Sequence, residues 1–253
     1  MKLAHKGFVF SLALMRAACG GGDTTETTTT PNPVANVSCD PNNPATYAEC
    51  GVVFIGMTDA DGDFLNYTVD VLSLELETAN GRIVETLPQT TRVNFTDYVD
   101  LTELVAAAHI PPATYIAGTI RIDYTNAEVY VEANGESKQA VVKNDLGTIL
   151  TQTELTIQLS DRDQLRITKG RAALLQLDFD LDASHTVDIV PTPAEVVTEQ
   201  FIIAEVFPVD EKDIRVRGPL VSVDQTEMTY TVALRPFHDH LGDFGQVTVH
   251  VTN

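Results

Sequence analysis

The sequence predicts a mainly β fold: an antiparallel β-sandwich with one short helix, followed by a partial small β-barrel-like domain. Apolar residues recur with a period of two along most of the chain after Gly51, which is typical of strands with one buried face. Turn dipeptides such as Asn80-Gly81 and Asn134-Gly135 separate several of these runs. Strands do not alternate with helical segments, which disfavours doubly wound and TIM-type enzymes. Hydrophobic residues make up 43% of the 253 residues, enough for a sizeable core.

The sandwich is expected over residues 51–192. Val52–Met57 is a short apolar strand at its start. The alternation that begins at Tyr67 changes phase at Val71-Leu72, which predicts a β-bulge within one long strand. Further strands are expected over Arg82–Glu85, Arg92–Phe95, Tyr115–Tyr124, Ala127–Glu132, Lys138–Val142, Thr153–Leu159, Leu175–Leu181 and Thr186–Val190.

One stretch has helical spacing. Apolar residues recur in Leu101–Ala108 at intervals of three and four, and Asp100 and Glu103 lie where the helix dipole favours acids. Pro111-Pro112 would end such a helix. The pattern therefore predicts one short helix that packs against a sheet.

A domain boundary is expected at Pro191-Thr192-Pro193. Strand-like runs follow over Gln200–Phe207, Ile214–Val223, Met228–Leu234 and Gln246–Val251. Residues 193–253 offer too little chain for a full β-domain. We therefore expect a partial second domain that has its last strand at an edge, where a strand needs protection.

The amino terminus has the features of a secretory signal. A basic start with Lys2 and Lys6 precedes the apolar run Phe8–Met15, and residues 1–18 are expected to form the signal peptide. Ala17-Ala18-Cys19-Gly20 resembles the lipobox of bacterial lipoproteins, although Arg16 replaces the usual leucine. The resemblance implies that Cys19 receives lipid, and Gly20 in place of aspartate implies sorting to the outer membrane. The alternative is an ordinary signal peptide with an incidental cysteine.

Residues 19–50 are expected to form a flexible tether and a disulfide loop. Gly20–Asn36 is rich in Gly, Thr and Pro and has almost nothing to bury. Cys39 and Cys50 remain as an even pair in an exported chain, which favours a disulfide. Zinc is the alternative, but two thiolates lack the four ligands of a structural zinc site.

About half of the chain resembles a bacterial domain of unknown function, the 4382-type β-domain. The matching pieces are Thr58-Asp59-Ala60, Val99-Asp100-Leu101, Pro112-Ala113-Thr114-Tyr115 and Leu177-Asp178-Phe179-Asp180-Leu181. Ala113 departs from the family's usual glycine. The resemblance implies an exported lipoprotein, and it brings no established activity or catalytic residue.

Asp59, Asp61 and Asp63 form the most suggestive local motif. Carboxylates at alternate positions can supply the oxygen ligands of calcium. Position twelve from Asp59 is Asp70 instead of the usual glutamate, so the motif is not an EF-hand. The alternative is a polar turn between two strands, since Asp and Gly are good turn formers.

Two further clusters carry weaker hypotheses. Asp178, Asp180 and Asp182 would share one face of a strand, where they could hold a cation or form the solvated side of a sheet. His238 and His240 could bind zinc or copper, or lie in an exposed loop.

The function classes follow from charge and missing motifs. Thirty-six acids against sixteen bases give a net charge of −20, which disfavours nucleic acid as a partner. No G-x-S-x-G motif occurs, and neither His109 at a helix end nor His185 in a polar turn suggests a triad. We expect no enzyme but a non-catalytic envelope or surface lipoprotein with a binding or structural role, attached to the membrane by its lipid, with an envelope protein or glycan as the partner in the binding case. The alternatives are a carbohydrate- or calcium-binding module, although the chain has no Trp for a sugar platform, and a metal-assisted enzyme.

Overall fold

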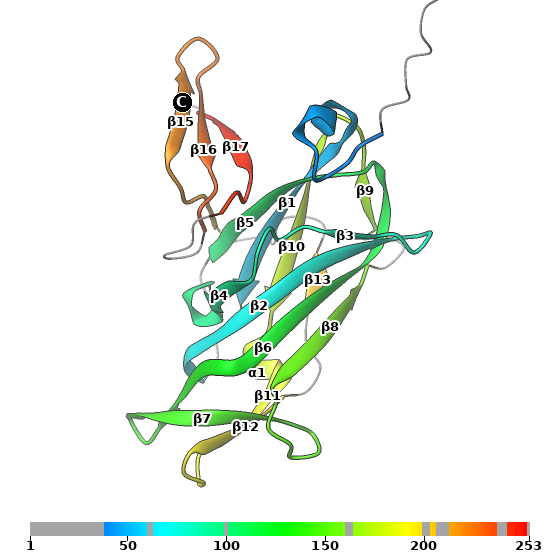
Figure 1. Ribbon diagram of the computed structural model, residues 1–253. Coiled ribbons are helices and arrows are strands. Elements are labelled where there is room, and N and C mark those ends of the chain that lie inside the picture. Colours follow the sequence, from blue (N-terminus) through cyan, green and yellow to red (C-terminus); the bar gives the residue numbers. More distant parts are fainter. Residues whose placement is uncertain are drawn as a thin grey trace, which may run out of the picture. The chain divides into compact units, whose positions relative to one another are not determined.

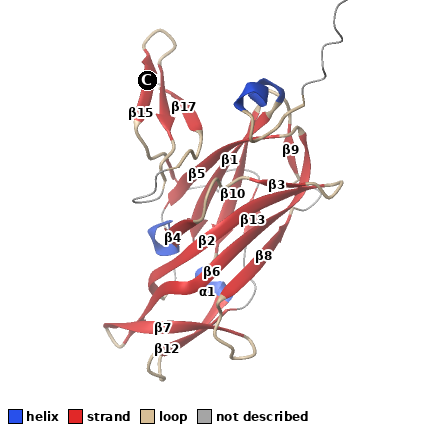
Figure 2. Cartoon of the chain, in the orientation of Figure 1, coloured by secondary structure: helices blue, strands red, loops and turns tan. Residues whose placement is uncertain are grey.

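The computed structural model describes residues 38–59, 63–98, 101–159, 164–198, 203–205, 213–236 and 242–251. Strands dominate this part of the chain, so the mainly β prediction is confirmed (Figures 1 and 2). Its helical elements are short: η1 (Pro44–Glu49), η2 (Phe95–Tyr98) and α1 (Leu181–Ser184). None of the helices in the described residues is long and apolar enough to span a membrane.

One five-stranded sheet has the order β13-β10-β1-β5-β14. Its strands are β1 (Gly51–Asp59), β5 (Leu101–Ile110), β10 (Ala172–Phe179), β13 (Ile203–Glu205) and β14 (Asp213–Arg215). The central strand β1 pairs in parallel with β10 and antiparallel with β5. The pairing is therefore mixed and not wholly antiparallel.

A nine-stranded sheet is built on two long strands, β2 (Phe64–Thr78) and β6 (Ala113–Ala133), which pair antiparallel (Figure 1). Its backbone order is β11-β12-β7-β6-β2-β3, with β4 on β2 and with β8 and β9 on β6. The other bounds are β3 (Ile83–Glu85), β4 (Thr91–Asn94), β7 (Glu136–Asn144), β8 (Gln152–Gln158), β9 (Leu165–Ile167), β11 (His185–Asp188) and β12 (Ala194–Thr198).

Local sequence signals account for much of this sheet. The register of β2 shifts between Val71 and Ser73, which is the predicted bulge. Asn134 and Gly135 both have positive φ in the turn that joins β6 to β7, as the Asn-Gly pair predicts. Leu155 and Ile157 in β8 are both 5% exposed, so the predicted face of this strand is the buried one.

The two sheets share one hydrophobic core. In Figure 1, β2, β6 and β8 cross in front of β1 and β10. Core side chains that are fully buried come from both sheets and include Val53, Ile55, Tyr67, Val69, Leu76, Ile120, Ile122, Leu165 and Phe179. Burial of these side chains supplies the main stabilisation, at about 25 cal/mol per Å² of apolar surface.

The predicted helix over Leu101–Ala108 is wrong, because this segment is strand β5. Leu104, Val105, Ala106 and Ala107 are all at most 6% exposed, so both faces of the strand are covered. A strand buried on both faces is a continuous apolar run without alternation, and short runs of this kind cannot be distinguished from a buried helix by periodicity. Pairing with β1 overrides the helix propensity of the alanines.

The strand predicted over Leu175–Leu181 ends at Phe179, so the three aspartates do not share one strand. Asp178 lies in β10, whereas Asp180 caps α1 with its side chain by accepting from the Ala183 N–H, and Asp182 lies within α1. Asp suits this position, because its side-chain oxygen can accept a hydrogen bond from an N–H group in the first turn of a helix.

Strands continue in the two sheets beyond Pro193, where a boundary was expected. β12 pairs with β7 and β11, β13 pairs with β10, and β14 pairs with β5. A separate three-stranded antiparallel sheet follows, here called the C-terminal sheet: β15 (Leu220–Asp224), β16 (Thr229–Ala233) and β17 (Gln246–His250). Among the described residues, β15 and β17 pair only with β16.

Candidate functional site

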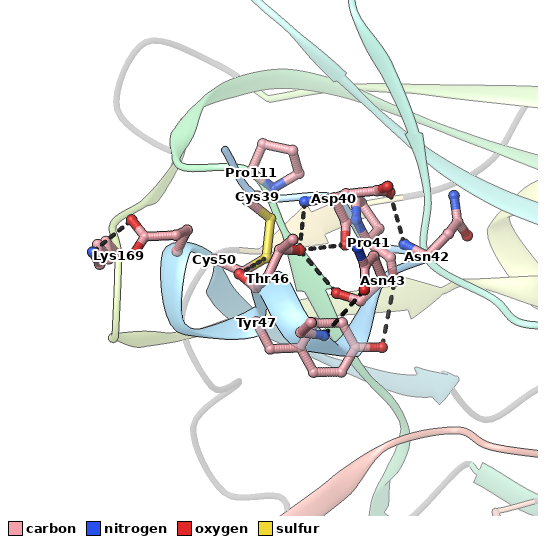
Figure 3. Close-up of a disulfide and its surroundings, with 12 residues drawn as sticks. Cys39, Asp40, Pro41, Asn42, Asn43, Thr46, Tyr47, Cys50, Pro111 and Lys169 are labelled. Carbon is pink, nitrogen blue, oxygen red and sulfur yellow. Dashed lines mark hydrogen bonds and ion pairs between the residues drawn. A yellow bond between two sulfur atoms is a disulfide. The ribbon is translucent and has the colours of Figure 1, made fainter. Parts of the chain in front are cut away.

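The disulfide loop begins the described chain. Cys39 and Cys50 form a disulfide with an S–S distance of 2.02 Å and a Cα–Cα distance of 4.9 Å (Figure 3). The hydroxyl of Thr46 accepts from the Asp40 N–H at 2.9 Å and lies 2.8 Å from the Asn43 carbonyl oxygen. The disulfide restricts the unfolded chain and so stabilises the fold by roughly 3 kcal/mol in the chain-entropy model.

The loop is fixed to the sheets by its own contacts. The Gly170 N–H donates to the Cys50 carbonyl at 2.9 Å, and Lys169 forms an ion pair with Glu49 at 2.6 Å (Figure 3). The ring of Tyr47 stacks on His109 of β5, with centroids 3.8 Å apart and planes within 4°. Burial lowers the pKa of His109, and the charge of Asp243 opposes this shift, so the imidazole is mainly neutral at pH 7.

A surface pocket of about 590 Å³ lies beside this stack. Four segments line it: the disulfide loop through Pro41, Asn42 and Tyr47, then residues 85–88, residues 107–109 and residues 243–246. Its volume is within the range of small-molecule sites, roughly 300–1,000 Å³. We take this pocket as the candidate functional site.

Close backbone contacts hold residues 243–246, which form one wall of the pocket, against β5. The Ala107 N–H donates to the Phe244 carbonyl at 2.7 Å, and the Leu234 N–H donates to the Gly245 carbonyl at 2.8 Å. Gly245 has φ +90, and a Cβ there would lie 2.1 Å from the Ala107 carbonyl oxygen. Only glycine fits so close an approach with this backbone conformation.

The polar side chains of the pocket include carboxylates and amides. Asn42, Asp243 and Gln246 are exposed, whereas Glu85 is tied down because its Oε1 accepts from the N–H groups of Leu74, Thr86 and Leu87 at 2.9–3.0 Å. Among the described residues that line the pocket there is no lysine or arginine. The lining therefore suits a neutral or cationic ligand and repels an anion.

His185 lies in the core and not in the polar turn that was predicted. It is 9% exposed, and its Nδ1 donates to the Leu181 carbonyl at 2.7 Å. Nε2 of a neutral imidazole then accepts from the Tyr67 hydroxyl, 3.0 Å away, which lies 3.2 Å from the Tyr124 hydroxyl. Burial lowers the pKa of His185 to about 4. This network is structural, because it is enclosed by the core.

A buried charge connects the C-terminal segment to the five-stranded sheet. Glu103 of β5 is fully buried and accepts a hydrogen bond from the Arg215 Nε, and the Arg217 Nε lies 3.4 Å from its other oxygen. Burial raises the pKa of Glu103, and the hydrogen bond from Arg215 offsets part of this rise. The arrangement holds β14 and the chain that follows it against β5.

The predicted metal residues are only partly within the described chain. Asp63 is exposed just before β2, the side chain of Asp59 is not described, and Asp61 lies outside the described residues. Cys19, His238 and His240 also lie outside them. No group of three or more potential ligands that could hold a metal occurs within the described part of the chain. Calcium at the aspartate motif stays a prediction.

Sequence reasoning missed the pocket. Tyr47 was only part of a turn-rich loop, and His109 was placed at the end of a helix that does not exist. The signal that could have drawn attention to them is the aromatic residue inside the disulfide loop, because a short closed loop presents its side chains in a fixed geometry.

The fold and the pocket define a β protein of three sheets that carries a surface pocket beside a disulfide loop. Comparisons of the chain with family models, with curated proteins and with solved structures found no match.

Proposed function

We propose that this chain is a non-catalytic lipoprotein of the bacterial cell envelope, anchored by lipid on Cys19 in the outer membrane, with a binding role. The structural observation that carries the proposal is the Cys39–Cys50 disulfide. Disulfides persist in oxidising compartments, which agrees with the export signal that the first 18 residues resemble.

Charge and surface chemistry support the same proposal. The net charge of −20 keeps the folded part soluble and away from anionic membrane surfaces, so a lipid anchor is needed to hold it there. A diacylated cysteine with a further acyl group exceeds the two-chain requirement for stable anchoring. The order of the four sequence pieces that resemble the 4382-type β-domain, whose members are often lipoproteins, is in keeping with this location.

Mass spectrometry of the protein extracted from membranes tests the proposal. The expected result is a mature chain that begins at Cys19 and carries the mass of its acyl groups. Cys19→Ser is the matched control and should abolish the added mass and release the protein from the membrane fraction. An intact Met1, or a free Cys19 thiol in soluble protein, would contradict the proposal. Recovery of the acylated chain with inner-membrane markers would contradict the outer-membrane assignment alone.

A further inference from the structure

The pocket beside Tyr47 combines a flat aromatic surface with exposed hydrogen-bonding groups. Tyr47 and His109 are both half-buried, and their stacked rings lie within 4° of parallel in the pocket wall. A Tyr ring offers a rigid apolar face, and the small number of exposed polar groups around it can fix the orientation of a ligand. Such a surface suits a ligand that has one apolar face and a polar rim.

The edge of β5 adds main-chain groups to this surface. Because the Ala107 N–H points away from β1 toward Phe244, the alternation of an antiparallel pair directs the N–H and C=O of His109 toward the same edge. Asn42 and Gln246 add an amide donor and acceptor each, and both side chains are exposed. Figure 3 shows the Asn42 side chain pointing away from the disulfide.

The charged groups that line the pocket disfavour anionic ligands. The described lining has the carboxylates of Glu85 and Asp243 and no lysine or arginine, and the whole chain carries −20. Both carboxylates already accept from main-chain N–H groups, since Asp243 Oδ1 lies 3.1 Å from the Gly245 N. The lowered pKa of His109 leaves a neutral imidazole in the wall. The pocket is therefore better matched to a neutral hydroxylated ligand than to an anion.

We propose that this pocket binds a neutral saccharide ring, with its C–H face against the outer face of one ring of the Tyr47–His109 stack and its hydroxyl groups on Asn42, Asp243 and Gln246. The Tyr47–His109 pair takes the place of the tryptophan platform that the chain lacks. This inference rests on the proposed envelope location, where glycans are within reach of the protein.

Titration calorimetry of the full chain in detergent tests the inference. The probes are glucose, galactose, mannose and N-acetylglucosamine, with glucosamine as the cationic match and glucose 6-phosphate as the anionic match. At least one neutral sugar should bind, and neither glucosamine nor glucose 6-phosphate should bind more tightly than that sugar. Binding of glucosamine or glucose 6-phosphate in preference to all neutral sugars would overturn the proposal, and so would no binding by any of the four.

Variants place the binding in this pocket. Tyr47→Ala should weaken binding about tenfold through loss of the stacking surface. Asn42→Ala should weaken it about threefold to tenfold through loss of a hydrogen bond, and it leaves the fold intact because Asn42 is exposed. Tyr130→Ala is the matched control, since Tyr130 of β6 is a half-buried tyrosine that does not line the pocket. Equal losses in all three variants, or none in Asn42→Ala, would overturn the assignment.

Because acylation of Cys19 is measured separately, an acylated chain without sugar binding would refute this inference and leave the proposed function intact.

Discussion

Apolar strand residues are buried in the two-sheet body but largely exposed in β15 of the C-terminal sheet. In β2, Val69, Val71 and Leu76 are fully buried. In β15, Leu220 is 61% exposed and Val223 is 58% exposed. The register places both on one face of the C-terminal sheet with Val232 and Tyr230, their respective partners, while Ser222 and Thr231 occupy the other face. An apolar strand sequence thus predicts a strand, but it does not predict whether a second layer covers its apolar side chains.

The difference between the regions should be largest for a matched leucine truncation. Leu76→Ala in β2 removes a fully buried side chain and should destabilise the protein by roughly 2–5 kcal/mol. Leu220→Ala in β15 removes a mostly exposed side chain and should cost less than about 1 kcal/mol. Urea unfolding measures both free energies. A large cost for Leu220→Ala would break the comparison, because it would show that the apolar face of the C-terminal sheet is covered in solution.

Acid should destabilise the body through His185. Its pKa is about 4 in the folded state and about 6.5 in the unfolded chain. Above pH 6.5 the imidazole is neutral in both states, so its titration does not reduce the free energy of unfolding. Between pH 6.5 and pH 4 the unfolded chain binds a proton that the folded protein does not, so the free energy of unfolding falls by roughly 3 kcal/mol over this interval.

His185→Phe isolates this effect from the titration of carboxylates. Urea unfolding of the variant between pH 7 and pH 4 should show a smaller loss of stability than the wild type over the same interval. Phe64 and Tyr67 lie edge-on to the imidazole, so an aromatic replacement retains most of the packing. Identical pH slopes in the two proteins would mean that His185 is protonated without penalty in the folded state.

The predictable part of this structure is local. The bulge of β2, the Asn-Gly turn before β7 and the buried face of β8 each depend on a few adjacent residues. β5 was not predictable, because its double burial arises from strands that are distant in sequence. The cysteine pair could be assigned by counting, since Cys19 has another expected role. The pocket could not be predicted, because its walls come from residues 41–47, 85–88, 107–109 and 243–246.

The junction between the regions depends on a glycine. Gly245→Ala would place a Cβ 2.1 Å from the Ala107 carbonyl oxygen, so residues 243–246 must move away from β5. Gly147→Ala is the matched control: its φ is also positive, at +76, but nothing lies within 4 Å of the added Cβ. The control should cost about 1–2 kcal/mol for its backbone conformation, and Gly245→Ala should cost measurably more by thermal or urea unfolding. Equal losses in the free energy of unfolding for the two variants would show that residues 243–246 can move away from β5 at little cost.

The smallest effects on stability should come from pairs of polar side chains at the surface. The coupling free energies of such pairs should be similar in the two regions. Lys143 of β7 and Glu195 of β12 form an ion pair at 2.6 Å in the body, and the Thr231 and Thr248 hydroxyls lie 3.0 Å apart in the C-terminal sheet. Double-mutant cycles with alanine should give couplings of about 0.2–1 kcal/mol for each pair. Only the Lys143–Glu195 coupling should fall with added salt, because it is ionic. Similar couplings would mean that both sheets are formed to the same degree and differ in stability through the covering of their apolar faces. A vanishing Thr231–Thr248 coupling would instead show that β16 and β17 are not firmly paired, and the contrast between the regions would then be one of strand formation.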